Sequence, residues 1–310
     1  MAGRELKGGD MIKRVELLHD IGNAKDVEDV YFADQVSGVF GVFDGVSMPY
    51  SVKHPIERFG PNHLSSGAVV VREVVSRTLQ ARVCNYKDEP LRDMIVSANH
   101  MVRFFQAMLG VPMDRTDMLP GAVFAAVKVG KEKTEILQCG DSMALWVKRD
   151  GSYWITRNQV LVHKSELWEE WRRLKRKHRE LCEGNLVAAY DAAWEELMPA
   201  YTEWRRVNTN NRASQNWYGL LNGQPQSEAC WFSAEVPTNE LVSIFLFTDG
   251  LVSYEDFSDE NDLARYILTV HRRLGSLGHI LESVRYNELL KKEKSLGIAR
   301  EATAIAVHLA

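Results

Sequence analysis

Several acidic residues stand beside a glycine at the end of a short apolar segment, an arrangement that can build a metal site. A carboxylate at the edge of a buried strand is costly unless it is paired or binds a cation. If the segments are strands of one core, their carboxylates converge, and a divalent ion relieves their mutual repulsion. The pairs are Asp44-Gly45 after residues 38–43, Gly140-Asp141 after residues 134–139, and Asp249-Gly250 after residues 243–248.

A fourth acidic pair, Glu28-Asp29, stands directly before the apolar residues 30–32. Carboxylates without nearby Cys or His favour Mg²⁺ or Mn²⁺ over Zn²⁺. The glycine beside each acid lets the backbone approach closely, so that its carbonyl can also bind the ion. The competing interpretation is an ordinary turn, because Asp-Gly after a strand is common turn chemistry. The order of the four pairs along the chain, rather than any one of them, favours a metal site.

The apolar pattern predicts the elements that position these acids. β-branched and aromatic runs predict strands, and apolar residues spaced every three or four positions predict helices. The middle of the chain reads as a meander of antiparallel strands, which disfavours a doubly wound nucleotide-binding fold. The expected strands cover residues 30–32, 39–43, 121–129, 134–139, 143–148, 153–156, 241–248 and 302–309, and the expected helices cover 64–79, 91–105 and parts of 259–292.

Residues 157–235 differ from the rest and are interpreted as a helical insert within a single domain spanning residues 1–310. Two charge-rich stretches, 166–182 and 186–207, predict a helical hairpin, and six of the eight tryptophans fall in the insert. The tryptophans favour a small core under the hairpin. The basic run 171–179 reads as a solvated helix face, with docking of an acidic or phosphorylated partner as the alternative.

Length and composition limit the function classes. The chain has 310 residues, of which 45% are hydrophobic and 26% charged, so it can bury a core and is not predominantly disordered. Its formal charge of −4 argues against a protein that coats nucleic acid or an anionic membrane. Four widely spaced cysteines predict no disulfide framework. The first residues carry no apolar stretch, so we expect no signal peptide and a cytoplasmic location.

The order of these motifs resembles that of the type-2C metal-dependent serine/threonine protein phosphatases. Residues 247–253 are similar to the family's Ser-Asp-Gly-Leu-Trp-Asp segment, and residues 140–144 to its Gly-Asp-Ser-Arg-Ala segment. Residues 301–307 resemble its closing strand, Asp-Asn-x-Thr-x-x-x-Val. The resemblance runs from about Asp20 to the C-terminus, apart from the insert, which lies where the family carries a variable flap.

The resemblance implies an α+β fold, a four-layer α-β-β-α sandwich of two antiparallel sheets flanked by helices. It also implies hydrolysis of phosphoserine or phosphothreonine in a phosphorylated protein substrate, with two or possibly three Mn²⁺ or Mg²⁺ ions as cofactors. Asp44 and Asp249 are the implied catalytic residues, and Asp44 would bridge two ions. The other implied ligands are Asp29, the carbonyl of Gly45, and Asp141 for an outer ion.

The sequence departs from the family pattern near its end and near its first strand. The last metal-binding Asp of the family falls on Arg300, and we expect Arg300 near the site and Glu301 facing away from it. The family's phosphate-binding arginine is missing, so Lys25 and Arg300 are the candidate phosphate ligands, and Arg14 is a more distant one. These departures leave a second hypothesis, a pseudophosphatase that uses the same sandwich as a binding module with the insert as its partner surface.

Overall fold

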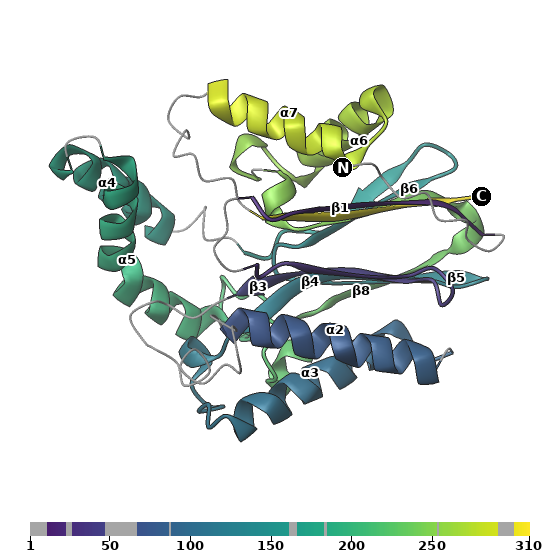
Figure 1. Cartoon of the computed structure of the whole chain (residues 1–310), viewed down its shortest axis with the longest axis horizontal. Helices are drawn as coiled ribbons and strands as arrows, with labels where there is room; N and C mark the ends of the chain where they lie inside the picture. The colour runs from purple at the N-terminus through teal and green to yellow at the C-terminus, as the bar shows by residue number, and fades with distance from the viewer. Residues whose placement is uncertain are drawn as a thin grey trace.

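The computed structural model describes residues 11–22, 27–46, 67–86, 88–160, 166–182, 185–252, 254–290 and 301–310. Two five-stranded antiparallel sheets lie face to face, and a pair of helices covers the outer side of each (Figure 1). The sequence therefore predicted the architecture correctly, as an α-β-β-α sandwich.

The first sheet has the strand order β1-β10-β9-β6-β7 and joins the two ends of the chain. β1 pairs with β10 along almost its whole length, with Glu16 opposite Ala306 and His19 opposite Thr303. The sequence predictions gave no range for β1. The strands are β1 (Ile12–Asp20), β6 (Met143–Lys148), β7 (Tyr153–Ile155), β9 (Leu241–Phe247) and β10 (Ala302–Leu309).

The second sheet has the order β2-β3-β4-β5-β8 and carries three of the four acidic pairs at or beside its strands. Its last strand, β8, pairs with β5 and begins at Phe232. Residues 232–235 therefore belong to the sandwich, and the predicted insert boundary at 235 was too late. The strands are β2 (Val30–Asp34), β3 (Val39–Val46), β4 (Gly121–Val129), β5 (Lys133–Cys139) and β8 (Phe232–Pro237).

Alternating side chains divide the core into layers. On β10, the odd-numbered Ile305 and Val307 pack between the sheets, whereas Ala302, Ala304 and Ala306 face the helices on the outer side. Small alanines allow these helices to approach the sheet closely. The outer helices are α6 (Glu260–Leu274) and α7 (Leu277–Leu290) on the first sheet, and α2 (Gly67–Asn85) and α3 (Leu91–Met108) on the second.

Helices α4 (Glu166–Leu181) and α5 (Leu186–Asn208) form the predicted hairpin, which projects beyond one end of the sandwich (Figure 1). The hairpin has its own small core of Trp171, Leu174, Ala193 and Leu197. The basic run is largely engaged within the hairpin: for example, Lys177 and His178 both contact Glu196.

Short 3-10 helices complete the described structure: η1 (Thr116–Met118), η3 (Pro225–Cys230), η4 (Thr238–Glu240), η5 (Asp249–Leu251) and η6 (Tyr254–Asp256). All four cysteines lie in the described ranges and none is in a disulfide. Within those ranges, no helix combines the length and the apolar character needed to cross a membrane.

Candidate metal centre

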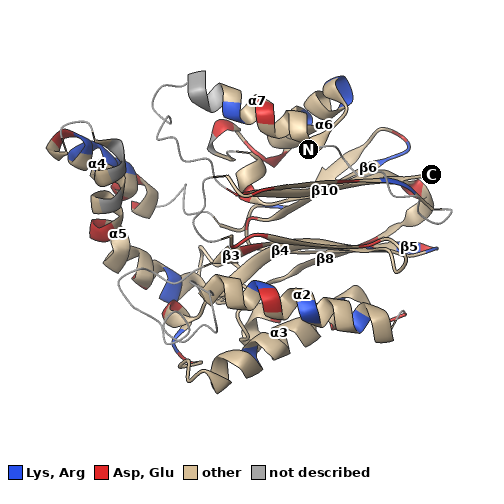
Figure 2. Cartoon of the chain, in the orientation of Figure 1, with Lys and Arg blue, Asp and Glu red and all other residues tan. Residues whose placement is uncertain are grey.

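The predicted acids meet at one end of the sandwich. Asp29 immediately precedes β2, Asp44 lies near the end of β3, and Asp141 lies in the turn between β5 and β6. Asp249 begins η5, one residue beyond the end of β9. Neighbouring ends of both sheets carry acidic residues on the side of the hairpin (Figure 2). The two facing sheets thus bring together carboxylates that are up to 220 positions apart, since 249 − 29 = 220.

Burial and mutual repulsion raise the pKa values of acids in this cluster. Burial, together with the negative charges of Asp29, Asp249, Asp141 and Glu28, raises the pKa of Asp44 well above its ordinary value. The pKa of Asp29 is raised to about 7, chiefly by burial and also by the charges of Glu301 and Asp249, although hydrogen bonds from threonine side chains oppose the shift. Carboxylates that resist ionisation in this way gain most from a bound cation.

Asp29 is held by a hydrogen-bonded chain that the sequence analysis did not find. The Thr248 hydroxyl donates to Asp29 Oδ2 at 2.9 Å and accepts from the Thr303 backbone N–H at 3.0 Å. The Thr303 hydroxyl in turn lies 2.9 Å from His19 Nδ1. Asp29 is only 3% exposed, so these contacts fix its orientation. Thr248 stands directly before Asp249 in the sequence, and this position beside a predicted metal ligand was the feature that could have indicated its role.

Glu301 faces the cluster, so the expectation that it points away was wrong. Its carboxylate accepts hydrogen bonds from the backbone N–H groups of Glu28, at 2.9 and 3.1 Å, and of Asp29, at 2.7 Å. The reason is strand alternation: Glu301 shares its parity with Thr303 and lies on the same side of the strand, toward Asp29. Arg300 lies outside the described residues.

Two glycines allow the backbone to close around the acids. A Cβ on Gly45 would lie 2.8 Å from the Cβ of Glu28 and 2.9 Å from its carbonyl oxygen. A Cβ on Gly250 would lie 1.5 Å from the carbonyl oxygen of Glu301, which any side chain would displace. The glycines beside Asp44 and Asp249 are therefore required by close packing, which a simple turn after a strand does not demand.

The turn that carries Asp141 is fastened from outside the sheet. The Gln159 side chain accepts from the backbone N–H groups of Gly140, at 2.9 Å, and of Gly219, at 3.0 Å. Gln159 also donates to the carbonyl of Cys230 at 3.1 Å. The segment after β7 and the segment before β8 thus hold the Gly140-Asp141 turn in place.

Arg72 on α2 is a described cation close to these acids, and the sequence analysis did not consider it. Arg72 donates to the backbone carbonyl of Val27, two residues before Asp29. Its charge also reaches His19, whose pKa is lowered by burial and by Arg72, while Glu301 opposes the shift. Lys25 lies outside the described residues. Arg14 contacts Glu16 and the carbonyl of Gly275 on the outer side of the first sheet, so it is not a phosphate ligand for this cluster.

The donor set matches a hard divalent cation. The charges of Asp29, Asp249, Asp141 and Glu28 all act on Asp44, and each of these side chains offers only oxygen to an ion. Mg²⁺ and Mn²⁺ prefer such oxygen ligands, whereas imidazole and thiolate groups would favour zinc.

Solved structures share this architecture along nearly their whole length. The serine/threonine phosphatase Stp1 from Staphylococcus aureus has a TM-score of 0.52 and 15% identity, with 100% of both chains covered. The chain has the fold of the PPM-type serine/threonine phosphatases. The PPM phosphatase MsPP from Mycobacterium smegmatis, in complex with cacodylate, has a TM-score of 0.52 and 14% identity, covering 96% of this chain and 99% of that chain.

A further PPM-like structure, the catalytic domain of the serine/threonine protein phosphatase PstP, contains two manganese ions. It has a TM-score of 0.51 and 15% identity, and covers 97% of this chain and 99% of its own. No protein-family model matches the sequence, and no curated protein does so. At these identities the PPM likeness establishes the architecture alone.

Proposed function

We propose that the chain is a metal-dependent phosphoester hydrolase of the PPM family that acts on phosphoserine or phosphothreonine in proteins. The observation that carries the proposal is the convergence of Asp29, Asp44, Asp141 and Asp249 at one end of the sandwich, where burial and the charges of the other three raise the pKa of Asp44. Solved structures of serine/threonine phosphatases with the same architecture, one of them containing two manganese ions, support the same function.

The chain's own residues divide into ion ligands and groups that orient them. Asp44 would bridge two Mn²⁺ or Mg²⁺ ions, with Asp29, Asp249 and the Gly45 carbonyl completing the inner ligands and Asp141 serving an outer ion. Bound divalent ions supply Lewis-acid activation of water and neutralise charge on the phosphoryl group. Thr248 and Glu301 keep Asp29 in position through its carboxylate and its backbone N–H.

Binding of the phosphate group requires a cation near these acids. Arg72 contacts the segment before Asp29 and stands at the first turns of α2. A guanidinium presents a planar fork of donors that suits phosphate oxygens. Arg72 therefore joins Lys25 and Arg300 as a proposed phosphate ligand. Because direct attack by water needs no enzyme nucleophile, we expect no covalent phosphoenzyme.

The proposal is tested by manganese-dependent release of p-nitrophenol from p-nitrophenyl phosphate. We expect activity in the wild-type protein that a chelator abolishes, and a loss of at least about 100-fold in Asp44→Asn, which keeps the shape of the side chain but removes its charge. Asp150→Asn, an exposed carboxylate in the β6–β7 turn, is the matched control and should leave the rate unchanged. Equal rates in wild type and Asp44→Asn would refute the proposal.

A second candidate function, a pseudophosphatase, is favoured by one observation. Glu301 stands beside the position where the family has its last metal-binding Asp, and its carboxylate is already engaged by the backbone of Glu28 and Asp29. In that case the sandwich would be a binding module and the hairpin of α4 and α5 its partner surface. Calorimetry separates the two: Mn²⁺ affinity weaker than millimolar in the folded protein would favour the pseudophosphatase.

A further inference from the structure

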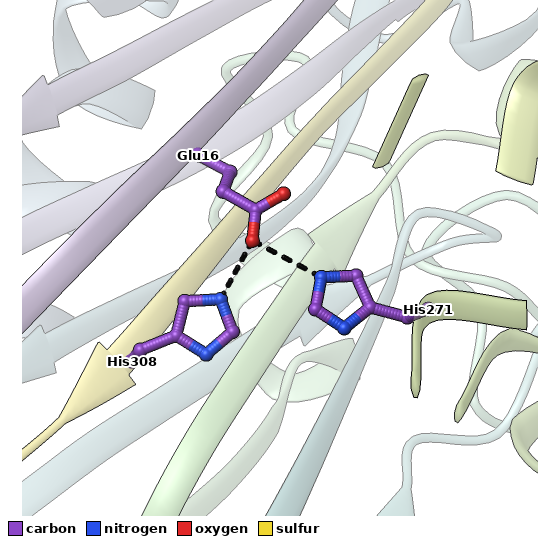
Figure 3. Close-up of side chains that lie close together, drawn as sticks. All are labelled: Glu16, His271 and His308. Carbon is purple, nitrogen blue, oxygen red and sulfur yellow. Dashed lines mark hydrogen bonds and ion pairs between the residues drawn. The ribbon is translucent and has the colours of Figure 1, made fainter. Parts of the chain in front are cut away.

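A second cluster of metal-ligating side chains lies on the outer side of the first sheet, under α6 and α7. Glu16 of β1, His308 of β10 and His271 of α6 point toward one another (Figure 3). Glu16 Oε1 lies 2.8 Å from His308 Nε2 and 3.1 Å from His271 Nε2. One ligand atom from each of the three lies within 4.8 Å of the other two.

This cluster is separate from the acids at the end of the sandwich. His308 is seven residues further along the chain than Glu301, which corresponds to roughly 23 Å of extended strand. The parity of the strand also differs: His308 shares the side of Ala304 and Ala306, which face α6 and α7. The acids therefore lie beside the start of β10, whereas the histidine cluster lies near its end and on the face that is turned to α6 and α7.

The three side chains are held in position by their surroundings. Their exposed fractions are 14% for Glu16, 13% for His271 and 21% for His308, so little solvent separates them. Glu16 Oε2 accepts from the backbone N–H of Leu277, at the start of α7, at 3.2 Å. The ring of Phe245 meets both imidazoles edge-on, with centroids 5.0 Å from His271 and 6.2 Å from His308.

We propose that Glu16, His271 and His308 form a binding site for a transition-metal ion of the zinc class. Two imidazole nitrogens and one carboxylate oxygen, with a fourth position left to water, are a common zinc ligand set. Bond lengths of about 2.0–2.1 Å in tetrahedral geometry place ligand atoms roughly 3.3 Å apart. The two distances from Glu16 Oε1 to the imidazoles, 2.8 and 3.1 Å, need to open by only a few tenths of an ångström, and the ligand atoms of the two imidazoles lie within 4.8 Å of each other.

Arg14 sets the affinity of this site because it competes for the same oxygen. Its guanidinium donates to Glu16 Oε1 and also reaches the Gly275 carbonyl at 3.4 Å. The Arg14 side chain is 43% exposed, so it can move into solvent when an ion binds. A positive charge beside the site weakens ion binding by Coulomb repulsion. Removal of this charge should therefore strengthen binding.

An ion here would connect the two ends of the chain to the helical layer. Glu16 comes from the first strand and His308 from the last, and His271 lies in the last turn of α6. Because the unfolded chain does not hold these three residues together, binding would stabilise the folded state. Imidazole ligands would also make this site select zinc or cobalt, whereas the acids at the sheet ends would select magnesium or manganese.

Cobalt titration tests the proposal through visible absorption, because Co²⁺ in a tetrahedral site with nitrogen ligands absorbs strongly there. We expect one such site in the full-length wild-type protein and a zinc-dependent rise in its melting temperature. His308→Gln keeps a hydrogen-bond donor for Glu16 but loses the metal-binding nitrogen. It should weaken Co²⁺ binding by more than about 100-fold, because loss of a residue that merely orients a ligand already costs about 10- to 100-fold.

Three further variants make the result decisive. His271→Gln should weaken Co²⁺ binding as His308→Gln does. Arg14→Gln should bind Co²⁺ several-fold more tightly than wild type. Asp44→Asn should retain the absorption, because it alters only the acids at the end of the sandwich. Circular dichroism confirms that each variant is folded. Equal Co²⁺ absorption and equal zinc-dependent stabilisation in wild type, His271→Gln and His308→Gln would overturn the proposal and leave the cluster as a hydrogen-bonded network.

Discussion

The hydroxyl of Thr248 joins Asp29 to the closing strand, and its removal gives a prediction at the scale of one residue. Thr248→Val keeps the shape but deletes both the 2.9 Å bond to Asp29 and the acceptor for Thr303 N–H. We expect Mn²⁺ affinity, measured by calorimetry, to fall by about 10- to 100-fold. Thr248→Ser retains the hydroxyl and should stay within a few-fold of wild type. Unchanged affinity in Thr248→Val would show that Asp29 needs no such support.

The raised pKa of Asp29 predicts how the metal-free protein responds to pH. In the folded state this carboxyl holds its proton up to about pH 7, whereas in the unfolded chain it ionises near its ordinary pKa of 3.8. The free energy of unfolding therefore falls as pH rises from about 4 to about 7, by at most about 1.4 kcal/mol per pH unit, and then levels off.

Urea unfolding in the presence of a chelator, at several pH values from 4 to 8, measures this slope. Asp29→Asn cannot ionise and should show a shallower fall across the same interval. Adding Mn²⁺ should stabilise the wild type more at pH 8 than at pH 5, because the ion competes with the proton. Identical slopes in wild type and Asp29→Asn would contradict the assignment of the raised pKa.

The acids themselves were readable from the sequence because each stands in a local pattern of apolar strand, acid and glycine. The residues that orient them were not. His19, Thr303 and Glu301 act through the pairing of β1 with β10 and through a backbone contact to Asp29. Such contacts depend on which strands become neighbours, and a single sequence does not display that. The alternation along residues 301–307 was visible, but which of its two faces looks toward Asp29 was not.

The close approach of η5 to the start of β10 predicts the effect of adding one methyl group at Gly250. Gly250 of η5 lies against the start of β10, where a Cβ would sit 1.5 Å from the Glu301 carbonyl oxygen. Gly250→Ala should lower the free energy of unfolding by about 1–3 kcal/mol and weaken Mn²⁺ binding, because Asp249 must move with the backbone. Thermal or urea unfolding measures the first effect.

Gly278 provides the matched control for this substitution. It lies in α7, and the nearest atom to a new Cβ would be Ser276 Oγ at 3.8 Å. Gly278→Ala should be neutral or slightly stabilising, since alanine is the better helix residue. Comparable destabilisation by both substitutions would show that the close approach at Gly250 is not what matters.

The outer and inner parts of the hairpin make different contacts, and this difference determines which residues can be deleted without damage to the sandwich. Its outer part has a separate core, but Trp204 stacks on Tyr218 at 5.1 Å, and the fully buried Arg205 donates to the Leu119 carbonyl at 3.1 Å. Sequence reasoning alone suggests that deletion of residues 164–206 leaves the sandwich folded. The structure places Trp204 and Arg205 against the sandwich, so that deletion would damage it.

We predict that replacing residues 169–199 with a short Gly-Ser linker keeps the sandwich folded and its activity on a small phosphate ester. Surface insertions of this kind are tolerated when their own contacts are local. Arg205→Met, by contrast, should destabilise the protein by about 1–3 kcal/mol, because it leaves the buried Leu119 carbonyl without its donor. Circular dichroism and urea unfolding report both effects. Global unfolding of the linker variant would show that the outer hairpin is part of the main core.

Most elements followed from periodicity, and the differences have physical causes. β1 (Ile12–Asp20) was given no range because charged residues interrupt it, yet it pairs along the length of β10. β8 was placed partly in the insert because Phe232–Pro237 is short and largely exposed, so its apolar signal is weak. Pairing with an established neighbour, rather than local composition, creates both strands.

At the scale of the whole molecule, two facing sheets explain why distant acids meet. β2, β3 and β5 of one sheet and β9 and β10 of the other place Asp29, Asp44, Asp141, Asp249 and Glu301 at the same end of the sandwich. The antiparallel order returns the chain to that end repeatedly. One architecture thus concentrates carboxylates at its end, while the outer side of the first sheet brings two imidazoles to Glu16.

Anomalous X-ray diffraction from crystals soaked in manganese measures directly whether these acids bind metal ions. We expect at least two manganese peaks at the end of the sandwich, with Asp44 contacting both ions and Asp29 or Asp249 contacting one, at oxygen–metal distances of about 2.0–2.3 Å. Crystals of Asp44→Asn should lose at least one of these peaks. Manganese peaks at other sites, with none at Asp29, Asp44 or Asp249, would show that these acids do not form a metal centre.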